Sequence, residues 1–261
     1  MKTHLAILSL AILSIIFSCK KEDDIVVADD TGTTDTTTDS TFTDNSNDVV
    51  VIDTTNNTDH VDNDSFQIES DQLTDTRDGQ KYKTVKIGSQ WWMAENLNYQ
   101  TPNNSWYYEN DSLQYAETYG RLYLYRAIMN NEASSHSNPS GVRGISPEGW
   151  HLPSIAEWQQ LDDYLSKWDM DAHDLKEIGG ANWPSNNPGT NDAGFNLVPA
   201  GTIFANGTIS ANLNVHTTFL SCTEDDETDG VLGVGFHSYS SGFHYAPLGR
   251  GNGWSIRCVK D

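Results

Sequence analysis

A run of carboxylates between Glu224 and Asp229, five in six residues, is the first group in this 261-residue chain that could do chemistry. Calcium ions take about six to eight oxygen ligands, so such a loop is a candidate calcium site. Its spacing matches neither an EF-hand loop nor the sugar-binding motifs of calcium-dependent lectins. We therefore interpret this segment as a solvated acidic loop and predict no metal site there.

Histidine and serine residues offer a second possibility. His237 and His244 could face each other across a hairpin, and serines lie near both, so a metal pair or a hydrolase has to be considered. No Gly-X-Ser-X-Gly sequence accompanies these serines, and the chain contains no CxxC or HExxH motif. We expect no catalytic residue, no bound metal and no cofactor, and hence a protein that is not an enzyme.

Four aromatic residues in polar, loop-like stretches are the candidate ligand-binding residues: Trp106, Tyr107, Tyr108 and Trp183. Aromatic side chains with a polar end are favoured where a surface meets a partner, and loops on a rigid scaffold often carry binding functions. The alternative is that these rings cover the core beneath long loops.

The charge of the chain excludes two kinds of partner. Lys and Arg total 15 against 37 Asp and Glu, which gives a formal net charge of −22. Binding of nucleic acid needs clustered cations, and so does docking on anionic lipid through a basic patch. The charge is also uneven, because residues 22–76 contain 16 acidic residues and no Lys or Arg. Much of the acidity therefore belongs to a leader rather than to a folded surface.

The first residues have the pattern of an export signal. Lys2 is followed by an apolar run from Leu5 to Phe17, which has the length of a signal-peptide core and is short for a membrane-spanning helix. The sequence Ile16-Phe17-Ser18-Cys19 resembles the lipobox of bacterial lipoproteins. This resemblance implies that residues 1–18 are a lipoprotein signal peptide and that Cys19 carries acyl chains that anchor the protein to a membrane. An ordinary secretory signal is the alternative.

The segment after the cysteine predicts a cellular location and a linker. Lys20-Lys21-Glu22-Asp23-Asp24 resembles the export signal of surface lipoproteins of the Bacteroidetes, so we expect an outer-membrane location facing the cell exterior. The periplasmic face is the alternative. Thr, Asp, Asn and Ser dominate residues 29–64, which have too few apolar side chains to offset the entropy of ordering. Residues 19–75 are accordingly predicted to be a disordered linker.

The body of the chain, residues 76–261, has the pattern of an α+β domain. An alternating run over 82–87 and an apolar run over 90–94 flank Gly88-Ser89, which predicts a β-hairpin with a two-residue turn. Ser154 followed by Glu157 predicts a capping box at the start of a helix. The other expected elements are one or two helices over 113–129, a loop over 131–149, a short helix over 171–178, and strands over 195–199, 217–222, 231–238 and 254–259.

Several ordered motifs in this body carry a family resemblance. They include Trp91-Trp92-Met93-Ala94-Glu95-Asn96-Leu97, Gly149-Trp150-His151-Leu152-Pro153-Ser154 and the ending Ser255-Ile256-Arg257-Cys258-Val259-Lys260-Asp261. With them, residues 76–261 resemble the Fibrobacter succinogenes major paralogous domain (FISUMP), whose members are typically lipoproteins or secreted proteins. The resemblance implies a C-type-lectin-like fold, in which the N- and C-terminal strands pair and two helices flank irregular loops.

The resemblance also bears on two cysteines. Many members of the family carry further cysteines that this chain lacks, which leaves Cys258 without the partner that the family would provide. Cys222 and Cys258 both lie on predicted strands and could pair instead in an oxidising compartment. A disulfide requires Cα atoms about 4.4–6.8 Å apart, which a sequence cannot establish. A possible disulfide and two buried thiols therefore both stay open.

These features together favour a binding protein. A lipid anchor, a long linker and an aromatic-rich domain predict a surface-anchored, non-catalytic binding or adhesion module whose ligand is a glycan or a protein. One alternative is a structural component of the envelope or matrix without a specific ligand. Another is an enzyme of the formylglycine-generating type, because Leu152-Pro153-Ser154 with Glu157-Trp158 is similar to a passage in those enzymes. They depend on a closely placed cysteine pair that holds copper, which Cys222 and Cys258 do not match.

Overall fold

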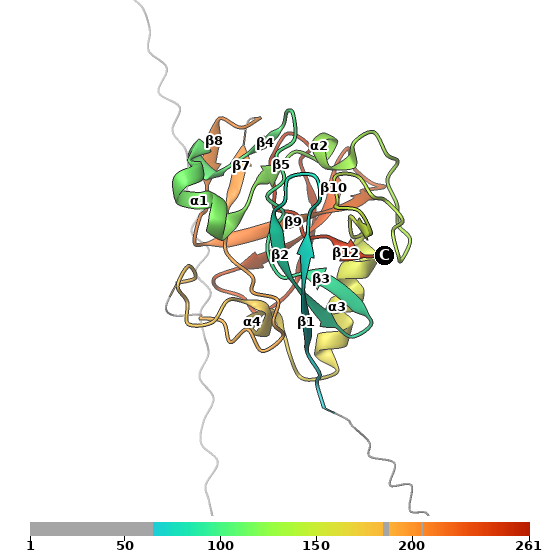
Figure 1. Cartoon of the computed structure of the whole chain (residues 1–261), viewed down its shortest axis with the longest axis vertical. Coiled ribbons are helices and arrows are strands. Elements are labelled where there is room, and N and C mark those ends of the chain that lie inside the picture. Colours follow the sequence, from blue (N-terminus) through green and yellow to red (C-terminus); the bar gives the residue numbers. More distant parts are fainter. Residues whose placement is uncertain (1–64, 185–187, 205) are drawn as a thin grey trace, which may run out of the picture. The chain divides into compact units, whose positions relative to one another are not determined.

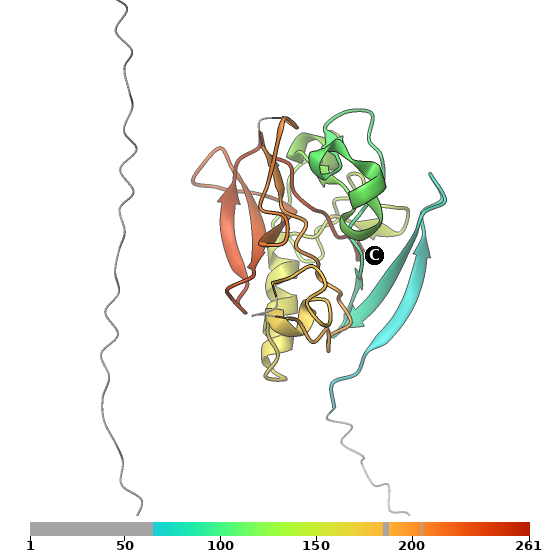
Figure 2. The same ribbon diagram turned by 90° about the vertical axis from the view of Figure 1, so that its left-hand side faces the viewer.

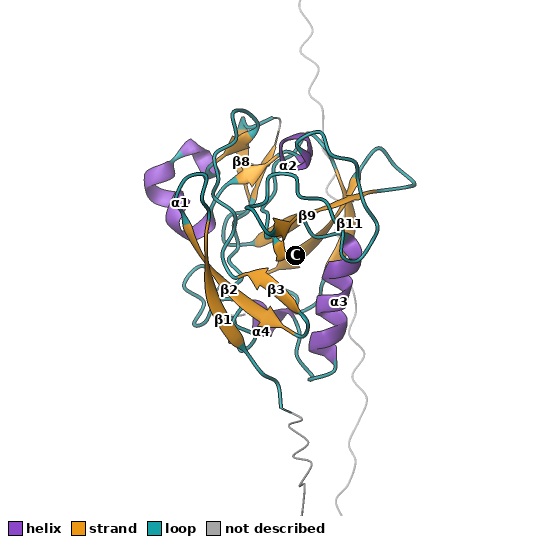
Figure 3. Ribbon diagram, turned by 45° about the vertical axis from the view of Figure 1, so that its right-hand side comes forward, coloured by secondary structure: helices purple, strands orange, loops and turns teal. Residues whose placement is uncertain are grey.

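The computed structural model describes residues 65–184, 188–204 and 206–261. The predicted signal peptide, Cys19 and most of the predicted linker lie outside the described residues. The described part is a mixed α/β unit of small antiparallel sheets, few helices and long loops (Figures 1 and 3). Among its helices, none combines the length and the apolar character needed to cross a membrane.

The largest sheet joins the two ends of the described chain. The predicted hairpin is confirmed, with Gly88 at a positive φ of 62° in its turn. The C-terminal strand lies between the second strand of this hairpin and a short strand before the longest helix. Across the sheet the strands are β1 (Glu69–Thr74), β2 (Lys81–Ile87), β3 (Gln90–Met93), β12 (Val259–Lys260) and β6 (Trp150–His151).

Strand β1 corrects the predicted extent of the linker. It pairs antiparallel with β2 over six residues, from Glu69 opposite Lys86 to Thr74 opposite Lys81. Just before it, the ring of Phe66 lies 6.0 Å from that of Tyr164. The prediction of disorder through residue 75 is therefore wrong for Glu69–Thr74. Most side chains of β1 are exposed, so the strand has no apolar pattern that the sequence could reveal.

Helix α3 (Ile155–Ser166) packs against two sheets. Figure 2 shows it, in yellow, between the β1–β2 pair and a second sheet of strands β9 (His216–Glu224), β10 (Val231–His237) and β11 (His244–Leu248). The ring of Trp158 lies 4.6 Å from Trp92 on one side and 5.3 Å from Phe219 on the other. The predicted capping box is confirmed, because the side chains of Ser154 and Glu157 each accept a hydrogen bond from the other residue's backbone N–H.

The remaining elements are short and lie mainly at the other end of the unit. The helical region predicted over 113–129 forms two helices separated by a strand. The two-stranded sheets and the small helices are β4 (Ser105–Trp106) with β5 (Leu122–Tyr123), β7 (Thr202–Phe204) with β8 (Ile209–Ala211), η1 (Tyr108–Asn110), α1 (Ser112–Tyr119), α2 (Tyr125–Met129) and α4 (Ala172–Leu175).

Strand predictions in the C-terminal half are confirmed in part. β9 and β10 match the strands expected over 217–222 and 231–238. No strand forms over 195–199, and over 254–259 only Val259 belongs to a strand. The predicted helix over 171–178 is limited to Ala172–Leu175.

A buried guanidinium contributes to the irregular conformation of the stretch over 195–199. Arg257 is 0 % exposed and donates hydrogen bonds to Asn96 Oδ1 at 2.9 Å, to Asn196 O at 2.9 Å and to the carbonyl groups of Met93 and Phe195. Burial lowers the pKa of Arg257 to about 9, which leaves it charged at neutral pH. In this stretch the carbonyl groups of Phe195 and Asn196 therefore accept hydrogen bonds from one cation rather than from a neighbouring strand.

Removal of β1 tests the corrected boundary. A chain that begins at Asp75 lacks β1 and loses the apolar contacts of Phe66 and Leu73, but it keeps the carboxylate that pairs with Arg77. Partial burial of two such side chains contributes about 2 kcal/mol. Since about 1 kcal/mol corresponds to roughly 2–4 °C in a domain of this size, we expect the thermal midpoint to fall by about 4–8 °C relative to a chain that begins at Ser65. Circular dichroism melts measure this shift, and equal midpoints would show that β1 is dispensable.

Candidate functional site

A polar cavity of about 710 Å³ opens beside α2 and is lined by three arginines. Its volume falls in the range of ligand pockets, roughly 300–1,000 Å³. Arg77 comes from the turn between β1 and β2, Arg126 from α2, and Arg143 from the loop over 131–149. No carboxylate is among the described residues that line this cavity, which we call the arginine cleft.

Arg77 forms a fixed wall of the arginine cleft. It donates to the two carboxylate oxygens of buried Asp75 at 2.8 and 2.6 Å and to Ile145 O at 2.8 Å. Its guanidinium also lies 3.8 Å from the centre of the Tyr99 ring, a cation–π contact. Burial acts to raise the pKa of Asp75, but hydrogen bonds and positive charge from Arg77 outweigh it and lower that pKa. Arg77 is thus committed to holding the cleft together.

The other two arginines of the cleft have N–H donors without a partner in the described part of the protein. Arg126 Nη2 donates to Asn104 Oδ1 at 2.6 Å. Arg143 is exposed, and its guanidinium makes no hydrogen bond or ion pair within the described part of the chain. Each guanidinium carries five N–H donors, so most of them face solvent or a ligand. The cleft can therefore receive an anion at Arg126 and Arg143.

Asparagines supply the rest of the polar lining. Asn130 and Asn131 end α2 in left-handed backbone conformations, with φ of 49° and 67°, a region that asparagine tolerates better than most residues. Their side-chain amides, like that of Asn103, have no hydrogen-bond partner among the residues that the structure describes. An amide both donates and accepts, so it matches hydroxyl groups as well as peptide groups.

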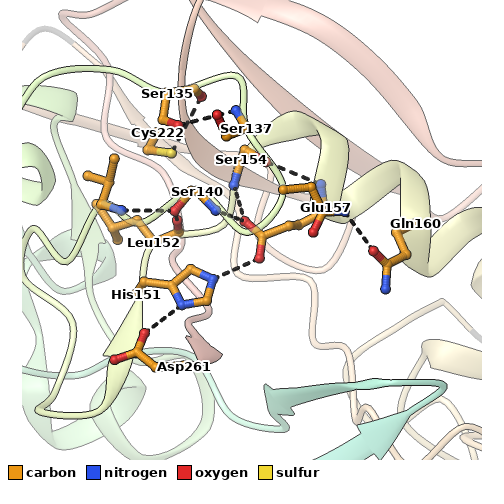
Figure 4. A network of polar contacts seen from close by, with 12 residues as sticks. Ser135, Ser137, Ser140, His151, Leu152, Ser154, Glu157, Gln160, Cys222 and Asp261 are labelled. Atoms are coloured by element: carbon orange, nitrogen blue, oxygen red, sulfur yellow. Dashed lines mark hydrogen bonds and ion pairs between the residues drawn. The ribbon is translucent and has the colours of Figure 1, made fainter.

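A buried network holds the loop that carries Arg143 (Figure 4). Glu157, 1 % exposed, accepts from the backbone N–H groups of Ser154 at 2.9 Å and Ser140 at 3.1 Å through one oxygen. Its other oxygen lies 2.7 Å from His151 Nε2, and His151 Nδ1 lies 2.8 Å from Asp261 Oδ1. Glu157 is therefore both the predicted helix cap and the anchor of this loop.

The far side of the loop is fastened to α2. Ile145 N–H donates to Ile128 O at 2.9 Å, and Gly144 N–H donates to Glu132 Oε1 at 3.0 Å. Gly144 has a φ of 52°, and a Cβ at this position would lie 2.2 Å from Ile128 O. Only glycine fits this close approach, which fixes Arg143 one residue away.

The His151 site has the electrostatics of a protonated imidazole. Burial acts to lower the pKa of His151, but hydrogen bonds and negative charge from Glu157 and Asp261 outweigh it, so the pKa is raised. A protonated imidazole donates from both ring nitrogens, which suits two carboxylate partners. The arrangement ties the C-terminal residue and β6 to the start of α3.

The structure corrects half of the aromatic prediction. Tyr108 and Trp183 are 8 % and 2 % exposed, and Trp183 Nε1 donates to Leu197 O at 2.8 Å, so both rings belong to the core. Trp106 and Tyr107 are half-buried. The guanidinium of Arg121 covers one face of Tyr107 at 3.9 Å. None of the four lines the arginine cleft.

The two cysteines are separate buried thiols rather than a disulfide. Burial raises the pKa of Cys222 to about 11 and that of Cys258 to about 12. Thiolates are the reactive form, so both side chains are poor nucleophiles and poor metal ligands at neutral pH.

His237 and His244, which the sequence allowed to face each other across a hairpin, have ring centres 4.8 Å apart, and Gly235 lies opposite His244. His216 lies on the other side of His237, at 5.5 Å. Burial and neighbouring imidazoles lower the pKa of His216, to about 4, and that of His237. In the described ranges, no group of three or more His, Cys, Asp or Glu side chains has a geometry that could hold a metal ion.

The acidic loop after β9 is partly neutralised by one cation. Arg250 lies 3.0 Å from Glu224 and 3.5 Å from Asp229. These contacts hold the loop against the turn after β11.

Sequence reasoning missed the arginines of the cleft. Arg77, Arg126 and Arg143 lie on three separate segments, and nothing in their local sequence marks them. One indirect signal in the sequence could have indicated a polar site. The loop over 131–149 contains a single Lys or Arg, Arg143, and it begins next to Asn130 and Asn131 at the end of a predicted helix.

Comparison with protein-family models matches residues 85–260 to the Fibrobacter succinogenes major domain. The matched range includes α2, the loop with Arg143 and the His151–Glu157 network, whereas Arg77 and β1 precede it. No curated protein and no solved structure matches the chain.

The His151–Glu157 pair predicts a stability that depends on pH. The pKa of His151 is raised on folding, so its charge stabilises the fold fully below about pH 6.5, its unfolded pKa. That contribution is lost as the pH rises through the raised pKa. Glu157→Gln keeps an acceptor for the helix cap but removes the charge. We expect it to lower the unfolding free energy by about 2 kcal/mol at pH 6, the range of a hydrogen bond to a charged group, and by less at pH 9.

Urea unfolding followed by tryptophan fluorescence measures both values. Asp261→Asn is the matched control, because the Asp261 side chain is 61 % exposed and its charge is screened by water. It should cost less than Glu157→Gln at pH 6. An equal loss at both pH values for Glu157→Gln would contradict a charged pair.

Proposed function

This chain belongs to the Fibrobacter succinogenes major domain family, and we propose that it is a surface-anchored lipoprotein whose folded domain is a non-catalytic binding module. The arginine cleft is the observation that carries this proposal. Guanidinium and amide groups neither gain nor lose protons near neutral pH, so they hold a ligand without acid–base chemistry. The ligand is a glycan or a protein.

Support for the anchor comes from the sequence. The lipobox-like Ile16-Phe17-Ser18-Cys19 assigns acylation to Cys19, and the charged Lys20–Asp24 segment favours the outer membrane with the domain facing the cell exterior. The acidic, apolar-poor segment that follows suits a tether between the membrane and the domain.

The proposal includes a C-type-lectin-like fold. In support, the C-terminal strand β12 pairs with β3 near the N-terminal side of the domain, and long irregular segments connect the short helices and strands. Two of these segments, the stretch after β3 and the loop over 131–149, line the arginine cleft. Loops on a rigid scaffold are a common place for binding sites.

Binding is tested with a glycan array and with a pull-down from envelope extract. We expect the protein to retain a ligand in at least one of the two, and removal of calcium with EDTA to leave the signal unchanged, because arginines and amides need no cation bridge. Failure of both assays would favour a structural envelope component without a specific ligand. A signal lost in EDTA would move the site to the acidic Glu224–Asp229 loop.

The anchor is tested by Cys19→Ser expressed in a Bacteroidetes host. We expect the unchanged protein to fractionate with membranes and to carry the mass of its acyl chains, and the variant to lose both properties. Protease treatment of intact cells then reports whether the domain faces the exterior. An unmodified Cys19 in native membranes would contradict lipidation.

A further inference from the structure

The arginine cleft has a charge opposite to that of the protein. The chain carries a formal charge of −22, yet three of its six arginines line this one cleft. Asp75 is paired with Arg77 through two hydrogen bonds. Within the described residues, neither Arg126 nor Arg143 forms an ion pair with a carboxylate, so both charges are open to an anionic group in the cleft.

The chemistry of the two arginines suits a carboxylate. Guanidinium groups present planar forks of N–H donors that match carboxylate oxygens in pairs. The Arg143 side chain has no hydrogen-bond partner in the described part of the chain, and Arg126 donates one hydrogen bond, to Asn104. Both belong to segments that are held in place, α2 and the loop anchored by Glu157.

The remaining lining is suited to hydroxyl groups rather than to a protein surface. Protein interfaces depend on aromatic or aliphatic anchors that fill apolar pockets. Here the one aromatic ring of the lining, Tyr99, is covered on one face by Arg77, and Asn103, Asn130 and Asn131 contribute side-chain amides that have no hydrogen-bond partner among the described residues. Amides that donate and accept can satisfy the hydroxyls of a sugar ring.

We propose that the arginine cleft binds an acidic sugar of the uronate type, with the sugar carboxylate on Arg126 and Arg143 and its hydroxyl groups on the neighbouring asparagine amides. This inference rests on the proposed function, since it names the ligand class of the same binding module. The cleft's volume of about 710 Å³ accommodates a short oligosaccharide segment.

Isothermal titration calorimetry with the full-length protein tests this. The probe is trigalacturonate, and the matched control ligand is its methyl ester, which keeps the sugar rings and hydroxyls but loses the carboxylate charges. We expect the acid to bind and the ester to bind at least tenfold more weakly. A polyglutamate peptide of similar charge serves as the acidic protein probe, and we expect it to bind more weakly than the acid.

Substitutions distinguish binding at the arginine cleft from non-specific attraction between the acidic sugar and any positive charge of the protein. Arg143→Gln and Arg126→Gln should each weaken trigalacturonate binding at least tenfold, the expected scale for a charge-assisted hydrogen-bonded pair. Arg143→Lys should retain more affinity than Arg143→Gln. Lys83→Gln removes the same charge from an exposed site on β2 and should change affinity less than about twofold, because exposed charges are screened by water and salt.

Each other outcome overturns the proposal. Equal binding of acid and ester, or an unchanged affinity in Arg143→Gln, would remove the carboxylate from the site. Polyglutamate that binds as tightly as trigalacturonate and is lost in the same variants would make an acidic protein segment the ligand. If neither trigalacturonate nor a glucuronate trimer binds, the acidic-sugar inference fails, whereas the proposed function fails only if the array and pull-down also yield nothing.

Discussion

The fold depends on a charge that is kept out of water. Removal of a cation from solvent costs several kcal/mol, and the interior tolerates it only when hydrogen bonds compensate for the lost water. Each nitrogen of the Arg257 guanidinium donates to an oxygen, and these oxygens come from the end of β3, from Asn96 and from the stretch at Phe195 and Asn196. It also packs on the Phe195 ring at 4.3 Å. Three distant parts of the chain must therefore converge on one side chain near the C-terminus.

The shape of the arginine cleft follows from this convergence. With Arg257 in place, β12 enters between β3 and β6, and Asp261 reaches His151. His151 in turn contacts Glu157, which fixes the start of α3 and the loop that carries Arg143 (Figure 4). A buried ionic network of this kind is a weak source of stability, and its value lies in allowing one arrangement of the loops. The cleft is thus assembled by the same contacts that join the chain ends.

The sequence predicted correctly the elements that interactions between neighbouring residues determine, such as turns and helix caps. The β2–β3 hairpin follows from alternation and Gly88, and the start of α3 follows from Ser154 and Glu157. The stretch over 195–199 was misread because an apolar run indicates burial and not conformation: Phe195 and Leu197 are buried, but by packing around Arg257 and Trp183. Trp183 lies among polar neighbours in sequence, yet tertiary contacts bury it. The cleft was invisible for the same reason, since three separate segments supply its arginines and only the topology brings them together.

Strand β1 has a mechanical consequence. The described chain enters at one end of this strand, while the cleft residue Arg77 follows its other end (Figure 1). If the domain is held at its N-terminal side and a bound ligand pulls on the cleft, the force acts along the length of β1. The hydrogen bonds of the six residue pairs between β1 and β2 then resist the force together, in shear, instead of breaking one after another. Such an edge strand would resist traction far better than its few buried side chains suggest.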